Sequence, residues 1–264
     1  MLRSVFSKTL WDQRRGIIGW SLGIAAVGVF YAAFYPSMAN PDMAAAMEAF
    51  PEGMLDALGF ADITSPAGYL AGTTYGLLGP VLMIIFASTF GARAIAGEEE
   101  AGRLDVLLAH PIDRGSVVVQ RAGALLVALT VAGVALFVAM SAVAGPAQFA
   151  EIGTANLGAA TLQLVLLGTF FGALALSVGA LTGRRGLASA VVAIIGLSGY
   201  FANTMGPSVE AIAWSRDLSP FRYYSGGQPL VNGWQLADGL VLLLAAVVLV
   251  AIGVVGFRRR DVAV

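Results

Sequence analysis

Ser198 and His110 are the residue types that could form a serine–histidine catalytic pair. Ser198 lies in the run Gly196-Leu197-Ser198-Gly199, a G-x-S-G pattern of the kind that carries the nucleophile in membrane-embedded proteases. Such a serine needs a histidine base within hydrogen-bond reach. The only histidine, His110, belongs to a connection between hydrophobic runs, whereas Ser198 lies near the middle of a run. The two side chains are not expected to meet, so the pattern does not predict a protease.

Nucleotide and metal chemistry is not indicated either. A phosphate loop of the form G-x-x-x-x-G-K-[ST] needs a lysine after glycine, and the only lysine, Lys8, has no glycine before it. There is no cysteine, and one histidine cannot make a metal site. The acidic, methionine-bearing stretch 42–58 leaves a soft-metal alternative, although methionine is commonly a packing residue. We expect no enzyme activity and no cofactor in this chain.

Long uncharged runs identify a membrane protein. Of the 264 residues 58% are hydrophobic and only 12% are charged, against roughly 25% charged residues in an ordinary soluble domain. Six runs contain no Asp, Glu, Lys or Arg, and each is long enough for a spanning helix of about 20 residues. They lack the alternation of barrel strands. We therefore expect an all-α, polytopic membrane protein with one transmembrane domain over 1–264 and spans at about 16–36, 72–96, 116–145, 157–182, 186–206 and 237–257.

The basic residues gather on one side of these spans. Four precede the first span, whereas the loop 37–62 has none. Others flank the second connection, fill the turn 184–185 and close the chain at 258–260, which leaves only Arg216 and Arg222 on the opposite side. By the positive-inside rule both termini are expected in the cytoplasm. The absence of cysteine fits the cytoplasmic (inner) membrane of a prokaryote.

Three further segments are expected to form short helices outside the spans. Residues 1–15 read as an amphipathic helix in the cytoplasmic interface, with a plain basic flank as the alternative. Residues 42–58 suit a pair of short outer helices. Residues 206–236 suit an interfacial or re-entrant helical hairpin on the outer side. There Arg216 and Arg222 are expected to contact headgroups or substrate, or to pair with acidic neighbours.

The connection 97–114 is acidic on the side where basic residues are the default. Three of its leucines share one face of a short helix, and Pro111 is expected to end that helix. Asp113 or Ser116 can cap the next span. A rigid amphipathic helix between two spans would let a soluble partner move them; the alternative is a helix that lies on the membrane surface.

The same connection resembles a known motif. The run Gly97-Glu98-Glu99-Glu100-x-Gly102-x-Leu104-x-x-Leu107-Leu108-x-x-Pro111-x-x-Arg114 resembles the cytoplasmic signature of type-2 ABC exporter permeases. The N-terminal Lys8-Thr9-Leu10-x-Asp12-x-Arg14-Arg15 is similar to the branch that contains antibiotic-efflux permeases and permeases for multicopper-enzyme maturation. The likeness covers most of the chain in layout and about 35 residues in motif.

The resemblance implies the membrane-spanning subunit of an exporter, with ATP and Mg²⁺ bound by cytoplasmic ABC ATPase subunits. A second permease would complete a homodimer or heterodimer, and nothing in the net charge of −1 points to nucleic acid. Residues 97–114 would be the coupling helix on the ATPase, and residues 1–15 the interfacial elbow helix. The coupling residues are then Gly97, Glu98, Glu99, Glu100, Arg103, Leu104, Leu107, Leu108, Pro111 and Arg114.

The uncharged interior of the spans suits a hydrophobic or amphiphilic substrate. Eight polar residues could line its path, although hydrogen bonding between helices is the favoured role for each taken singly: Thr73, Thr74, Tyr75, Ser88, Thr89, Gln163, Asn203 and Thr204. A secondary transporter driven by protons is disfavoured because the spans carry no ionisable relay. Sodium coupling through carbonyls and hydroxyls stays open, as does a non-transporting membrane scaffold.

Overall fold

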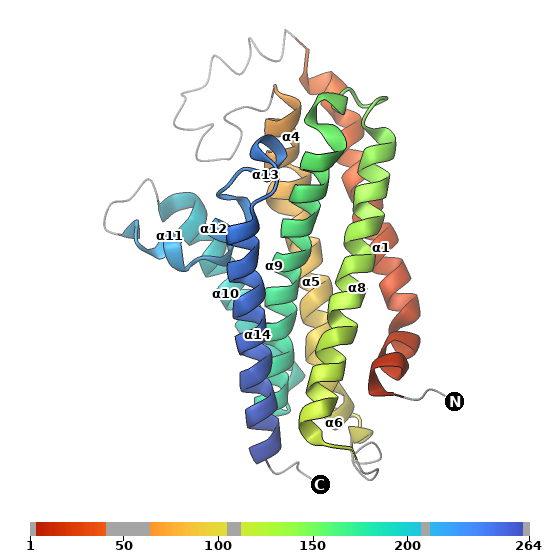
Figure 1. The fold of residues 1–264 in the computed structure, drawn as a ribbon, viewed down its shortest axis with the longest axis vertical. Coiled ribbons are helices and arrows are strands. Elements are labelled where there is room, and N and C mark those ends of the chain that lie inside the picture. Colours follow the sequence, from red (N-terminus) through yellow and green to blue (C-terminus); the bar gives the residue numbers. More distant parts are fainter. Residues whose placement is uncertain (1–3, 41–63, 105–111, 207–211, 261–264) are drawn as a thin grey trace.

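The computed structural model describes residues 4–40, 64–104, 112–206 and 212–260, and within these ranges the chain is all-helical with no strand. Six helical stretches are long and apolar enough to cross a membrane, as predicted (Figure 1). They are Val5–Met38, Pro66–Glu100, Arg114–Val143, Ala150–Thr182, Arg185–Met205 and Leu236–Arg259. Each exceeds the roughly 20 residues that a span requires. The predicted outer helices at 42–58 lie outside the described residues.

The first span is a single continuous helix, α1 (Val5–Met38). It begins at Ser4, whose hydroxyl accepts a hydrogen bond from the Ser7 N–H at 3.2 Å. Residues 1–15 were predicted as a separate elbow helix, and their described part from Val5 onward forms the first turns of α1. Phe6 packs on the core and its N–H donates to the Gln120 side chain at 3.1 Å, which fixes these turns against the third span. Their place in the membrane interface stays a prediction.

The second span contains two widened turns. It runs through α4 (Pro66–Gly72), η1 (Thr74–Leu78), α5 (Gly79–Ala92), η2 (Arg93–Gly97) and α6 (Glu98–Glu100), and both η segments are π-helical. A π turn inserts one residue into the helical ladder and commonly marks a functional position. Glycine suits the first of them, since a Cβ at Gly76 would lie 2.0 Å from the Ala71 carbonyl oxygen. The span therefore has two places where its register departs from the α-helix.

Helix α9 (Gly153–Thr182) forms the centre of the bundle. It follows the short η3 (Ala150–Ile152) and packs against α5, α8 (Arg114–Val143), α10 (Arg185–Met205) and α14 (Leu236–Arg259) (Figure 1). Glycines permit these close crossings, as expected for membrane helices. A Cβ at Gly91 of α5 would lie 2.4 Å from the Gly172 carbonyl oxygen of α9. Backbone thus meets backbone where the second and fourth spans cross.

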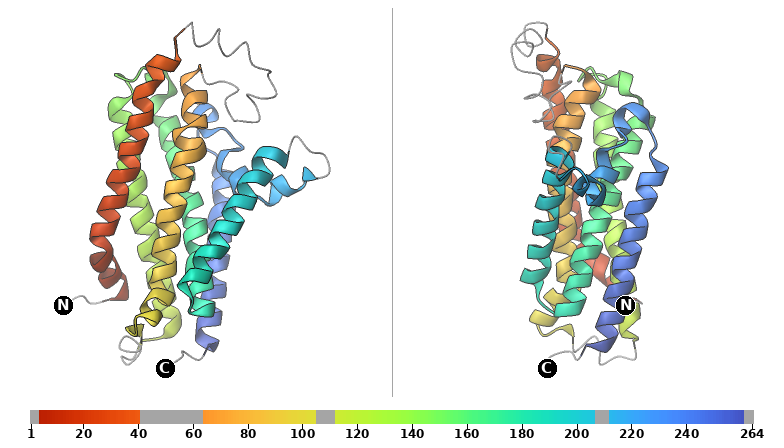
Figure 2. Two further views of the ribbon diagram at one scale, coloured as in Figure 1. Left: turned by 180° about the vertical axis from the view of Figure 1, so that it is seen from behind. Right: turned by 90° about the vertical axis from the view of Figure 1, so that its left-hand side faces the viewer.

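The predicted hairpin before the last span is a set of three short helices. These are α11 (Ser215–Leu218), α12 (Pro220–Ser225) and α13 (Pro229–Asn232). Figures 1 and 2 show α11 and α12 beside the bundle and below its upper end. The Ser219 hydroxyl donates to the Gly199 carbonyl of α10 at 2.7 Å, and the buried Tyr224 hydroxyl donates to the Tyr75 carbonyl of η1. The hairpin therefore returns into the bundle, in keeping with the re-entrant alternative.

One end of the bundle collects the start of α1, α6, the turn between α9 and α10 and the end of α14 (Figures 1 and 2). We call this end, which carries residues 4–16, 93–104, 112–121, 183–186 and 256–260, the basal end. The first described helix therefore begins, and the last one ends, on the same side of the bundle, as an even number of spans requires.

Candidate functional site

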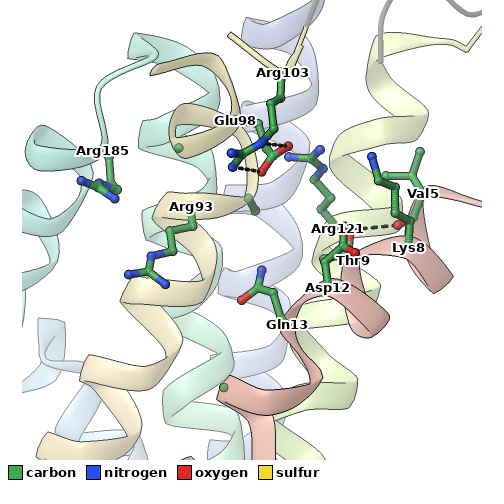
Figure 3. Close-up of a pocket in the computed structure, with 13 residues that line it drawn as sticks. Val5, Lys8, Thr9, Asp12, Gln13, Arg93, Glu98, Arg103, Arg121 and Arg185 are labelled. Atoms are coloured by element: carbon green, nitrogen blue, oxygen red, sulfur yellow. Dashed lines mark hydrogen bonds and ion pairs between the residues drawn. The ribbon is translucent and has the colours of Figure 1, made fainter. Parts of the chain in front are cut away.

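The basal end holds three consecutive glutamates, each joined to a different part of the chain. Glu98 faces Arg103, with one guanidinium nitrogen 2.9 Å and the Nε 3.3 Å from its carboxylate oxygens (Figure 3). The turn between them passes through Gly102 at φ +64°, and the Arg103 N–H donates to the Glu98 carbonyl at 2.9 Å. Glycine tolerates this left-handed conformation. The predicted coupling residues Glu98 and Arg103 thus form an ion pair that closes the turn 98–103.

Glu99 joins the second span to the last one. Its carboxylate accepts a hydrogen bond from the Arg260 guanidinium, and both side chains are mostly buried, with exposed fractions of 14% and 18%. Arg260 is the C-cap of α14, and its carbonyl accepts a hydrogen bond from Arg114 at 2.8 Å. The predicted coupling residue Arg114 therefore lies in the same network, which ties α6 and the start of α8 to the end of α14.

Glu100 joins the second span to the fifth. One of its carboxylate oxygens accepts the backbone N–H of Arg185 at 2.8 Å, and the other lies 3.7 Å from the Arg185 Nε. A carboxylate is well placed at the start of α10, because the first backbone N–H groups of a helix lack internal partners. Unlike the Glu99 pair, this pair is half-exposed. The second span is thus tied to both α10 and α14 at the basal end.

Asp113, one of the two predicted candidates, is the N-cap of α8. Its carboxylate accepts the Ser116 N–H at 2.9 Å and lies 2.9 Å from a guanidinium nitrogen of Arg258. The hydrogen bond from Arg258, followed by that from the Ser116 N–H, lowers the pKa of the Asp113 carboxyl. The cap is therefore a carboxylate at neutral pH, and it adds a second connection between α8 and α14.

Leu104 is buried inside the chain instead of facing a partner. It is 1% exposed and belongs to a cluster with Ile95, Val118, Leu176 and Phe257. A side chain packed on four spans has little free surface in this chain, and the role of Leu104 at an ATPase contact stays a prediction. The rest of the predicted stripe, Leu107 and Leu108, and the helix-ending Pro111 lie outside the described residues, as does His110.

The polar residues predicted for a substrate path do not share one cavity. Tyr75 lines a cavity of about 190 Å³ between α4, α12 and α13, whereas Gln163 lines one of about 270 Å³ beside the start of α14. Tyr75 hydrogen-bonds the Thr161 hydroxyl at 3.0 Å, and the Gln163 amide donates to the Gln235 carbonyl at 2.9 Å. These contacts join helices, as the alternative interpretation proposed.

Three more of these residues bond to their own helices. The hydroxyls of Thr73, Ser88 and Thr204 donate to backbone carbonyls three or four residues earlier, at 2.6–3.1 Å. The remaining three differ in burial: Thr74 is buried, whereas Thr89 and Asn203 are partly exposed. A path along these residues stays a prediction.

Sequence reasoning missed the arginines that form ion pairs with the acidic residues of the connection 97–114. Arg185, Arg258 and Arg260 were read only as topology signals, yet they are the partners of Glu100, Asp113 and Glu99. A signal was present, because an acidic run on a strongly basic side needs basic partners. Its pairing depends on how the spans pack, which the local sequence does not encode.

Comparison with known families gives a match over nearly the whole chain. The family described as "Multidrug efflux system permease Rv1217c, C-terminal domain" matches residues 2–258. A comparison with curated proteins finds no match. The matched range includes most of each of the six spans and most of the charged network of the basal end.

Proposed function

This chain belongs to the family of the multidrug efflux system permease Rv1217c, C-terminal domain, and from that premise we propose that it is the membrane-spanning subunit of an ATP-binding-cassette exporter. The match confirms the resemblance to exporter permeases, and with the six apolar helices it identifies a multi-pass transporter permease. The proposal adds a cytoplasmic ATPase that binds ATP and Mg²⁺, since this sequence has no G-x-x-x-x-G-K-[ST] loop.

The observation that supports the proposal most is the attachment of α6 to two other spans. Glu99 reaches Arg260 at the end of α14, and Glu100 reaches Arg185 at the start of α10. A force applied to the connection 97–114 would therefore act on the second, fifth and sixth spans together. The π turn η2 lies directly before α6. A π turn shifts the helical register by one residue, so the second span could change its register at this point when α6 is pushed. This arrangement suits a segment that receives a push from a soluble ATPase.

The remaining parts of the proposal concern topology and cargo. We place the basal end in the cytoplasm of a prokaryote, because the basic residues concentrate there. The cargo is a hydrophobic or amphiphilic molecule moved outward across the cytoplasmic membrane, in keeping with the efflux family and the uncharged spans. A second permease, identical or related, completes the transporter.

The orientation can be tested with single cysteines, because the natural chain has none. Ala101→Cys places a thiol at the exposed turn of the basal end, and Gly145→Cys places one at the exposed α8–η3 turn of the opposite end. A membrane-impermeant maleimide added to whole cells should label only the Gly145→Cys variant, while permeabilised cells should show labelling of both variants. Labelling of the Ala101→Cys variant alone in intact cells would invert the topology.

Co-purification tests the energy source. The tagged chain is extracted from its native membrane in mild detergent, and its companions are identified by mass spectrometry and assayed for ATP hydrolysis. A stoichiometric P-loop ATPase supports the proposal. Its reproducible absence from an intact preparation would instead favour an ion-coupled secondary transporter or a non-transporting scaffold.

A further inference from the structure

A cavity of about 430 Å³ lies at the basal end, beside the contacts that join α6 to α10 and α14. Its walls come from the first turns of α1, from η2 and α6, from α8 and from the start of α10 (Figure 3). This volume lies in the range of small-ligand pockets, about 300–1,000 Å³. The cavity is therefore large enough for a small polar group.

Positive charge dominates the lining. Two carboxylates, Asp12 and Glu98, face five cationic side chains, which are Lys8, Arg93, Arg103, Arg121 and Arg185. Glu98 is already engaged by Arg103, and Arg185 pairs with Glu100 outside the lining. Among the described residues no salt bridge joins Lys8, Arg93 or Arg121 to an acid. The cavity thus keeps a cationic surplus that the acids of the described chain do not neutralise.

Arg121 is the most unusual of these cations because it is buried. The residue is 6% exposed, and its Nε and Nη1 have no hydrogen-bond partner among the described residues. Figure 3 shows the guanidinium reaching from α8 toward Glu98 and Arg103, among the residues that line the cavity. Burial of a guanidinium without acceptors is costly, so an anionic acceptor in the cavity would relieve that cost.

We propose that this cavity binds a phosphate group, carried by the headgroup of an anionic membrane lipid or by free phosphate. Arg121 supplies the buried donors, and Lys8 and Arg93 supply further positive charge from α1 and η2. A guanidinium matches phosphate oxygens in charge and geometry. Basic pockets between membrane helices bind lipid headgroups in this way. A phosphate held there joins α1, η2 and α8, next to the network of the basal end.

The test uses the full chain purified in mild detergent and titrated with phosphatidylglycerol or phosphatidylcholine under native mass spectrometry. The variants Arg121→Gln and Arg93→Gln each remove one cation from the cavity. Arg259→Gln is the matched control, since Arg259 is exposed in the last turn of α14 and does not line the cavity. We expect phosphatidylglycerol to bind one site at least about tenfold more tightly than phosphatidylcholine, with a loss on the order of tenfold in either cavity variant and less than about twofold in the control.

A second arm separates the two sources of phosphate. Inorganic phosphate is compared with chloride at equal ionic strength, and the melting temperature of the protein is followed. Stabilisation by phosphate in the natural chain but not in Arg121→Gln, without lipid discrimination, assigns the cavity to free phosphate. If Arg121→Gln fails to fold, the same comparison is made with Arg93→Gln, because Arg93 is exposed and its substitution should not disturb folding.

Equal responses of the cavity variants and Arg259→Gln to both probes would overturn the proposal. The site does not depend on an ATPase partner, so such a failure would leave the proposed export function untouched. Conversely, an absent ATPase would not affect the binding result.

Discussion

The pair between Glu99 and Arg260 should contribute more stability than the neighbouring pair between Glu100 and Arg185. The perturbation is Glu99→Gln, which removes the charge and keeps the shape, and its matched control is Glu100→Gln one residue later. Glu99 and Arg260 are exposed by only 14% and 18%, whereas Glu100 and Arg185 are exposed by 43% and 51%. Screening by water is therefore weak for the first pair and strong for the second.

The expected magnitudes follow from this difference in exposure. Breaking a buried pair costs about 3–5 kcal/mol because the remaining charge is stranded, and partial exposure of Glu99 and Arg260 reduces the expectation to about 1–3 kcal/mol. The Arg260 Nη1 already lacks a partner among the described residues, so no spare acceptor compensates for the loss. The half-exposed pair should contribute about 0–1 kcal/mol.

Thermal unfolding in detergent, followed by intrinsic fluorescence, measures the difference. At about 2–4 °C per kcal/mol for a chain of this size class, Glu99→Gln should lower the melting temperature by about 2–12 °C and Glu100→Gln by less than about 4 °C. The double variant Glu99→Gln/Arg260→Gln closes a cycle, and its loss should be smaller than the sum of the single losses. Equal losses for the two glutamate variants, or additive losses in the cycle, would refute this reasoning.

Three further perturbations test the packing and the capping. Gly91→Ala should destabilise the protein by about 1–3 kcal/mol, because its Cβ would lie 2.4 Å from a backbone oxygen, whereas Gly19→Ala, with open space around it, should be nearly neutral in the same melting assay. Tyr224→Phe removes a buried hydroxyl that donates to a carbonyl of η1 and should lower stability by about 1 kcal/mol. The loss should exceed that of Tyr223→Phe, whose hydrogen bond is exposed. Equal losses would contradict the packing of the α11–α13 hairpin into the bundle. The pKa of Asp113 lies below its ordinary 3.8, so its contribution to stability is present above pH 3.8 and declines as the pH falls through the folded pKa. When the melting temperature is measured from pH 5 to pH 3, Asp113→Asn should reduce its fall with pH. An unchanged slope of melting temperature against pH would disprove this assignment.

Much of the architecture could be predicted because the bilayer constrains it so strongly. Runs without charge must span as helices, and the structure has candidate spans at all six. The N-cap at Asp113 was also predictable, since capping depends on neighbouring residues alone. The predicted boundary between residues 1–15 and the first span was wrong. No proline interrupts the hydrogen bonding of α1 between Val5 and Pro36, so the described residues of the two segments form one helix.

The contacts of the basal end could not be predicted from local pattern. The pairing of Glu99 with Arg260 joins residues 161 positions apart, and it depends on how the second and last spans cross. The π turns are similarly hidden, because they arise from packing around residues such as Gly76 and not from a sequence signal that we recognised. The burial of Leu104 was missed for a related reason. An apolar stripe is compatible with a partner, a membrane surface or the chain's own core, and only the packing distinguishes them.

Residues 97–114 are proposed to meet a cytoplasmic ATPase, and site-specific cross-linking from this segment would detect that contact. The Ala101→Cys chain, in its native membrane, is treated with a short thiol-to-amine cross-linker, and the adduct is identified by mass spectrometry; Gly145→Cys, exposed at the opposite end, is the control. We predict an adduct between the thiol of the Ala101→Cys chain and a P-loop ATPase, and none from the thiol of the Gly145→Cys chain. A preparation in which both thiols react with the reagent, yet the Ala101→Cys chain yields no ATPase adduct, would contradict the claim.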